Sequence, residues 1–145
     1  MKRTFIIVSV LTLGLTAAIA QSNVVEQRQD LMKQFGAQTR TISGMLRGQT
    51  PFDLAQAKAA LKTVSDGAKK LPPLFPESTK GVGKTEALPT IWENKAEFEK
   101  LFASLDAASQ KALAGITDEA SFKAQIPGVL QNCGTCHKMY RAPPK

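Results

Sequence analysis

The sequence has very few of the side chains that usually carry catalysis or bind metals. Its 145 residues contain one histidine, two cysteines, one tryptophan and one tyrosine. With a single histidine and no carboxylate pair placed for acid–base work, the chain lacks the groups of a typical active site, and we do not expect an enzyme. Exported chains often join cysteines in disulfides, but here the only two thiols lie three positions apart, directly before the histidine.

Several larger patterns are missing as well. Long alternation of apolar and polar residues is absent, so we expect no β-strand. The 19 basic residues outnumber the 12 acidic ones, for a formal charge of +7, but they are spread along the chain and form no stripe with interleaved aromatic residues. We therefore expect no nucleic-acid partner. A modest positive field could steer an acidic redox partner, although a solvated surface explains the charge equally simply.

The N-terminus has the three parts of a secretory signal. Met1–Arg3 is basic, residues 5–19 are largely apolar, and Ala18-Ile19-Ala20 has the small-x-small pattern of a cleavage site. The alternative is a membrane anchor, but the run is shorter than the roughly 20 apolar residues that span a bilayer. We expect cleavage of residues 1–20, export to the periplasm and a mature chain of 145 − 20 = 125 residues that does not span the membrane.

The remaining residues 21–145 are enough for one domain, and their apolar spacing predicts four helices. Apolar residues recur at steps of three and four in four segments: residues 24–46, 51–71, from 90 onward, and 118–141. The long loop at 72–89 contains Leu74, Phe75 and Val82, so we expect it to pack against the body. Four amphipathic helices with mostly short connections favour an all-α fold, an antiparallel up-down four-helix bundle.

Polar residues suggest where these helices begin. The expected caps are Asn23 with Glu26, Thr50 followed by Pro51 and Asp53, and Thr90 with Glu93. In the last helix, Pro127 should produce a kink or reduce the order of the first part.

The pentapeptide Cys133-Gly134-Thr135-Cys136-His137 carries the chemistry. On a helix, residues three and four apart share a face, so both thiols and the imidazole point the same way. Two thiols can bond the vinyl groups of a haem while the histidine binds its iron, and this pentapeptide is the signature of c-type haem attachment. Three other interpretations fit less well. A redox-active dithiol normally lies in a strand–helix setting, and a structural zinc site needs four ligands. A simple disulfide would not explain why a histidine follows the second cysteine.

The position of this pentapeptide limits the sixth iron ligand. Only Met139 follows it among the methionines, two residues after His137, and cannot reach the opposite face of the haem. Any sixth ligand must therefore come from upstream.

The sequence resembles the cytochrome c-prime family and its low-spin, methionine-ligated relatives, the class II c-type cytochromes. The resemblance covers essentially all of the mature chain. Its motifs are Arg28-Gln29-x-x-Met32, Gly83-Lys84-Thr85, Leu88-Pro89-x-Ile91-Trp92 and Cys133-x-x-Cys136-His137-x-x-Tyr140-Arg141.

The resemblance implies a role for each matching residue in binding one covalent haem c near the C-terminal helix. Cys133 and Cys136 form the thioethers and His137 is the proximal iron ligand. Arg28 and Gln29 lie beside the haem edge, with Arg28 near a propionate, and Lys84 and Thr85 belong to a loop that folds over the haem. Arg141 would shield the proximal side of the haem. For Arg28, Lys84 and Arg141, the alternative is an ordinary charged side chain in solvent.

Met32 decides between two functions. The resemblance implies that Met32 is the sixth iron ligand, or that it only covers an open iron; an ordinary core position is the third alternative, and Met45 is a weaker ligand candidate. Ligation implies electron transfer with a periplasmic or membrane-bound redox partner. An open iron implies binding of a diatomic gas, nitric oxide or carbon monoxide. Relatives often dimerise through the first two helices, so a homodimer is also an expectation.

Overall fold

The computed structural model describes residues 9–143, which are almost entirely helical. Its elements are α1 (Ser9–Leu46), α2 (Leu54–Lys70), the 3₁₀ turns η1 (Pro72–Leu74) and η2 (Glu77–Thr79), α3 (Thr90–Glu93), α4 (Lys95–Gly115) and α5 (Glu119–Tyr140). The described part contains no strand, only one isolated antiparallel bridge between Ala87 and Arg141. The predicted all-α class is confirmed.

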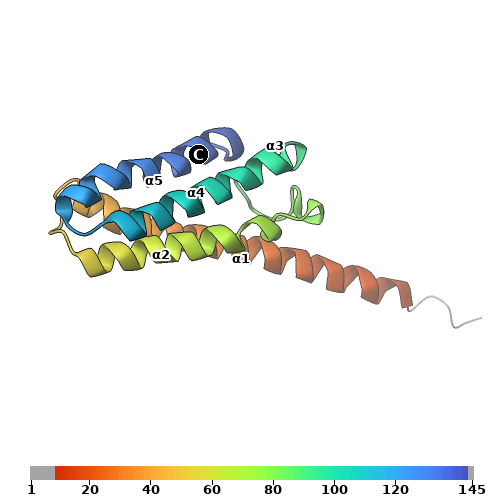
Figure 1. Ribbon diagram of the computed structural model, residues 1–145. Helices are drawn as coiled ribbons and strands as arrows, with labels where there is room; N and C mark the ends of the chain where they lie inside the picture. Colours follow the sequence, from red (N-terminus) through yellow and green to blue (C-terminus); the bar gives the residue numbers. More distant parts are fainter. Residues whose placement is uncertain (1–8, 144–145) are drawn as a thin grey trace, which may run out of the picture.

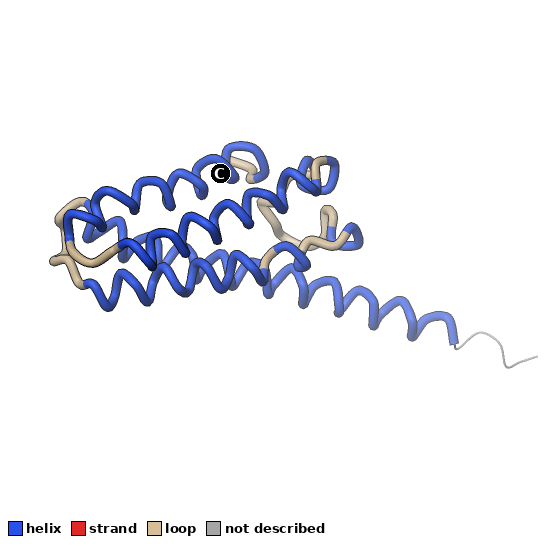
Figure 2. Tube along the Cα trace, in the orientation of Figure 1, coloured by secondary structure: helices blue, strands red, loops and turns tan. Residues whose placement is uncertain are grey.

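Four long helices form the bundle. Figure 1 shows α1, α2, α4 and α5 running side by side, with short connections at one end and the 72–89 segment at the other. The tube in Figure 2 shows that tan loop segments are confined to the two ends of the bundle. Helix α2 packs on both α1 and α4, and α5 packs on α4 and α1. This is the expected up-down four-helix arrangement, with the short α3 as an addition.

Helix α1 is longer than the sequence analysis predicted. It begins at Ser9 instead of residue 24, so Asn23 lies inside the helix and the predicted cap with Glu26 is wrong. The apolar residues before position 24 include several leucines and alanines, which are strong helix formers, and contain no proline to end the helix. The first part of α1 extends beyond the bundle (Figure 1). Within the described residues, no helix is both long and apolar enough to cross a membrane.

Two other predicted caps are also wrong. Asp53, not Thr50, caps α2, because its carboxylate accepts a hydrogen bond of 2.8 Å from the backbone N–H of Gln56. The expected helix from residue 90 is divided at Asn94, and Pro89 rather than Thr90 precedes its first segment. The Thr90 hydroxyl instead donates to the Met139 carbonyl oxygen at 3.2 Å. A contact between distant segments therefore replaces the local cap.

Helix α5 begins where it was expected to begin. Asp118 accepts from the N–H of Ser121 at 2.8 Å, and the Ser121 hydroxyl accepts from the N–H of Asp118 at 3.1 Å, which forms a reciprocal capping box. The helix continues through Pro127, and its first part stays helical. One N–H of the first turn, that of Ser121, thus gains a partner that the helix itself cannot supply.

A cluster of aromatic rings fills the end of the bundle near the 72–89 segment. Phe98 lies edge-on to Phe75, Phe102 and Tyr140, with ring centroids 4.8, 5.1 and 5.2 Å away. Phe75 is 4% exposed and contributes from the loop itself. The expectation that this loop packs against the body is confirmed, and the packing fixes the loop relative to α4 and α5.

Helices α1 and α2 are in tight contact at Gly67. A Cβ atom on this residue would lie 2.4 Å from Cε1 of Phe35. Only a glycine admits the ring at this distance, so Gly67 and Phe35 set the spacing of the two helices.

Candidate haem site

The cysteines and histidine of the pentapeptide lie near the C-terminal end of α5. Cys133 and Cys136 are half-buried free thiols that pack against the core, and His137 is exposed. Burial raises the pKa of both thiols; that of Cys136 rises to about 11, with the nearby Cys133 as a second cause. Both sulfurs therefore stay protonated at neutral pH.

The imidazole of His137 has a pKa below its ordinary value. Loss of hydration is the larger cause, and the positive charge of Arg141 adds to it, while Glu86 acts in the opposite direction. A lowered pKa favours the neutral imidazole, which is the form that binds a metal. Within the part of the chain that the structure describes, no group of three or more His, Cys, Asp or Glu side chains is arranged to hold a metal ion.

The end of α5 is tied to the loop before α3. The Leu88 N–H donates to the Tyr140 carbonyl oxygen at 3.0 Å, and the Ala142 N–H donates to the Glu86 carbonyl oxygen at 2.8 Å. Arg141 Nε also donates to the Glu86 carboxylate at 2.7 Å. Arg141 is therefore an exposed member of an ion pair. No feature of the sequence singled out Glu86, because its partner lies 55 residues away.

Arg28 is buried, and the alternative of a solvated charge is wrong. It is 2% exposed, and its Nη1 and Nη2 donate to the hydroxyl oxygens of Thr79 at 3.1 Å and Thr85 at 3.3 Å. The guanidinium carbon lies 4.8 Å from the centre of the Phe75 ring and 5.8 Å from that of Trp92. Burial lowers the pKa of Arg28, although arginine remains charged at any physiological pH.

This burial leaves a cation without a carboxylate. Among the described residues, the eight ion pairs do not include Arg28. A buried charge is costly unless it is paired. The carboxylates of a haem would be a suitable partner for this cation. The two thiols of α5 and its imidazole are the side chains that a c-type haem site requires. The residues present thus fit a covalently attached haem.

The other residues predicted for the site also come together. Gln29 Nε2 donates to the Lys84 carbonyl oxygen at 2.6 Å, so the loop residue binds α1 through its backbone while its side chain is exposed. The Thr85 hydroxyl oxygen accepts from Arg28 and from the Ala87 N–H at 3.1 Å. These contacts place the loop against the segment of α1 that precedes Met32.

The two methionines of α1 differ in burial. Met32 is half-buried, one helical turn after Arg28, and packs against the edge of the core. Met45 is 2% exposed and lies within the core near the opposite end of the helix. Met45 therefore serves as a core side chain, which makes it a still weaker candidate ligand.

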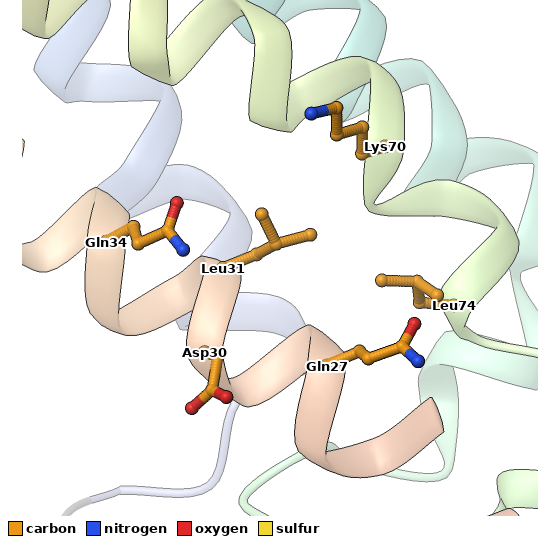
Figure 3. Close-up of a pocket in the computed structure, with 6 residues that line it drawn as sticks. All are labelled: Gln27, Asp30, Leu31, Gln34, Lys70 and Leu74. Carbon is orange, nitrogen blue, oxygen red and sulfur yellow. The ribbon is translucent and has the colours of Figure 1, made fainter. Parts of the chain in front are cut away.

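A separate open pocket of about 380 Å³ lies between α1 and the end of α2. Its lining residues are Gln27, Asp30, Leu31, Gln34, Lys70 and Leu74. Figure 3 shows Leu31 and Leu74 directed toward the space, with Lys70 across from α1. None of the predicted haem residues lines it. Homodimer formation through the first two helices stays a prediction.

Comparison with known proteins agrees with the geometry. The family model for cytochrome c′ matches residues 23–141. The chain belongs to the cytochrome c′ family. It is 48% identical to the cytochrome c′ of Rhodopseudomonas palustris over 136 residues, 94% of this chain and 93% of that protein. It is 35% identical to the cytochrome c-556 of the same organism over 145 residues, 97% of each chain.

Structural similarity extends to the same family. A crystal structure of a triple mutant of R. palustris cytochrome c′ has a TM-score of 0.81 and 48% identity, covering 83% of this chain and 98% of that chain. As a cytochrome c′ family member, the chain is a haem protein that binds a covalent haem c with iron. Its bundle is the fold of this family.

Proposed function

We propose that this cytochrome c′ family member is a periplasmic electron carrier in which Met32 is the sixth iron ligand. The observation that carries the proposal is the position of Met32, half-buried one turn after the buried Arg28. Met45 is used by the core and Met139 lies two residues from His137. Among the methionines of residues 21–145, Met32 is thus the one best placed to serve as an iron ligand.

Each residue of the proposed haem site then has a defined role. Cys133 and Cys136 would hold the haem through two thioethers, and His137 would be its proximal iron ligand. The iron supplies the redox couple, and a methionine ligand raises its potential. Arg28 pairs with a propionate and so gains the carboxylate that its buried site lacks.

The loop residues hold the haem edge. Gln29 fixes the backbone of Lys84, while Thr85 binds Arg28. These bonds hold the loop against α1 beside the proposed site. The chain has a single histidine and no carboxylate pair placed for acid–base work. Both observations support an electron carrier rather than an enzyme.

The alternative function is binding of nitric oxide or carbon monoxide at a five-coordinate iron. One observation favours it: the chain is more similar to cytochrome c′ of R. palustris, at 48% identity, than to its cytochrome c-556, at 35%. In this alternative, Met32 covers the iron without binding it.

Absorption spectra of the purified haem protein distinguish the two functions. We expect a low-spin spectrum in both oxidation states that becomes high-spin in Met32→Ala. Met45→Ala is the matched control: it should lower stability by about 2–5 kcal/mol, as for other buried methionines, and leave the spectrum unchanged. A high-spin wild-type protein, or a Met32→Ala variant with an unaltered spectrum, would refute methionine ligation.

Export to the periplasm would remove the signal by cleavage after Ala20. The R. palustris triple mutant changes a glutamine numbered first, a phenylalanine 31 positions later and a tryptophan 40 positions after that. Gln21, Phe52 and Trp92 have the same spacing in this chain, which supports Gln21 as the mature N-terminus. The intact mass of the exported protein tests this, and a product that retains residues 1–20 would contradict it. The physiological partner is then a periplasmic or membrane-bound redox protein.

A further inference from the structure

Thr79 is a fully buried residue whose hydroxyl has a fixed orientation. Its exposed fraction is 0%. The hydroxyl donates to the Pro76 carbonyl oxygen at 2.8 Å. Because its only proton is used there, the oxygen can act toward Arg28 Nη1, 3.1 Å away, only as an acceptor. The same Pro76 oxygen accepts from Trp92 Nε1 at 3.0 Å, which holds the turn around Thr79 in place.

The groups around Arg28 hold its guanidinium without neutralising it. Two hydroxyls, from Thr79 and Thr85, accept its hydrogen bonds, and the rings of Phe75 and Trp92 lie within cation–π distance. All four groups are uncharged. A glutamate or aspartate at position 79 would satisfy the same nitrogen but cancel the charge, so the choice of threonine preserves a full positive charge in a buried place.

The position of Thr79 is also fixed relative to both α1 and α5. Arg28 connects it to α1, one turn before Met32. On the other side, the chain continues from η2 through Thr85 to Leu88, which bonds the end of α5 at Tyr140. The segment therefore spans from the α1 side of the site to the α5 side.

We propose that Thr79 is a positioning residue for the haem: it orients Arg28, which no carboxylate of the described chain neutralises, toward a haem carboxylate. The inference rests on the proposed function in one respect, that Arg28 faces the haem. A nearby positive charge in a medium of low polarity favours addition of an electron, so Arg28 raises the reduction potential. The same charge keeps a neighbouring carboxylate ionised to lower pH.

The test compares Thr79→Val with Thr79→Ser in the haem-loaded protein. Valine has nearly the shape of threonine but cannot accept from Arg28, whereas serine keeps the hydroxyl. We expect Thr79→Val to lower the reduction potential and to move the acid-side inflection of the potential–pH profile to higher pH. Thr79→Ser should match the wild type in both. Intact mass checks that each variant retains its haem.

Arg28→Met separates a failure of this inference from a failure of the proposed site. If Arg28→Met changes the potential and Thr79→Val does not, Thr79 has no positioning role and the inference is overturned. If neither changes it, Arg28 does not face the haem, and the proposed role of Arg28 falls with it.

The double variant Thr79→Val/Arg28→Met shows whether Thr79 acts through Arg28. We expect its potential to equal that of Arg28→Met alone, because coupled residues are not additive; two fully additive shifts would overturn the inference. Should Thr79→Val fail to fold, Thr79→Asp gives an independent test. Its carboxylate retains the contact but neutralises Arg28, so the potential should fall, and an unchanged potential would refute the proposal.

Discussion

Replacing Gly67 with alanine tests the tight contact between α2 and the Phe35 ring of α1. The added Cβ would lie 2.4 Å from Cε1 and 2.9 Å from Cζ of Phe35. Phe35 is 7% exposed, so its ring has little room to turn away, and either the ring leaves its preferred rotamer or α1 shifts. Overpacking of this kind costs about 1–3 kcal/mol, and the better helix propensity of alanine offsets about 0.5–1 kcal/mol. We expect a net loss of about 0–2.5 kcal/mol from these two terms, with a central value of about 1.3 kcal/mol.

Thermal unfolding followed by circular dichroism measures this loss. For a chain of roughly 125 residues, an unfolding entropy of about 2.1 cal/mol/K per residue converts the central loss of about 1.3 kcal/mol to a fall in Tm of about 5 °C. Gly128→Ala is the matched control, since Gly128 also lies within a helix but a Cβ there would meet nothing within 4 Å. The free energy of unfolding of Gly128→Ala should rise by about 0.5–1 kcal/mol.

The outcome that refutes this reasoning is a Gly67→Ala protein as stable as Gly128→Ala. It would mean that the ring of Phe35 repacks freely and does not set the helix spacing. A second readout links the contact to the iron: Phe35 follows Met32 by three residues on α1. If Met32 is a ligand, displacement of α1 in Gly67→Ala should add a high-spin component to the spectrum.

Three further changes test the core, a buried polar network and a cap. Phe98→Ala removes the ring shared by the aromatic cluster and should cost about 3–5 kcal/mol in denaturant unfolding; a loss below about 1 kcal/mol would contradict the central place of this ring. Ser65→Ala leaves the half-buried Asp106 without its 2.6 Å hydroxyl donor and should cost about 1–3 kcal/mol by the same measurement, with an unchanged midpoint as the contrary result. Asp118→Ala should lower stability at neutral pH, because the hydroxyl and N–H of Ser121 hold the pKa of the Asp118 carboxyl below its usual 3.8. This stabilisation is present above the unfolded-state pKa and is lost as pH falls through the folded-state pKa, so an equal difference from wild type at neutral and strongly acidic pH would disprove it.

The sequence was sufficient for those parts of the structure that local spacing determines. Apolar residues at helical intervals gave the number and order of the long helices, because a helix that buries one face needs that period wherever it packs. The pentapeptide of α5 was equally readable, since its three reactive side chains share a face through helix geometry alone.

Predicted helix starts failed where a polar side chain had a better partner elsewhere. Thr90 has the sequence of a cap, yet its hydroxyl bonds the carbonyl of Met139, 49 residues away. Thr50 lost its predicted role to Asp53, whose carboxylate is the stronger acceptor for the exposed N–H of Gln56. Local sequence identifies a group that can cap, but packing decides which group does.

The surroundings of Arg28 were the least predictable part of the site. The resemblance placed Arg28 at the haem edge, but burial to 2% exposure depends on Phe75 and Trp92, which come from distant segments. Thr79 carried no signal at all, because a threonine in a polar loop is usually solvated, and only the folded chain removes it from water.

The spacing of the two cysteines has a consequence for how the protein folds. A cross-link restricts the unfolded chain more when the loop it closes is longer, with the logarithm of loop length. Cys133 and Cys136 lie only three positions apart on one turn of α5. A haem bonded to both would therefore reduce the entropy of the unfolded chain very little. It would instead remain tethered to that chain, so that refolding brings α1 and the loop against a cofactor already present. Recovery of the native state after unfolding would then be a unimolecular event, independent of protein or haem concentration.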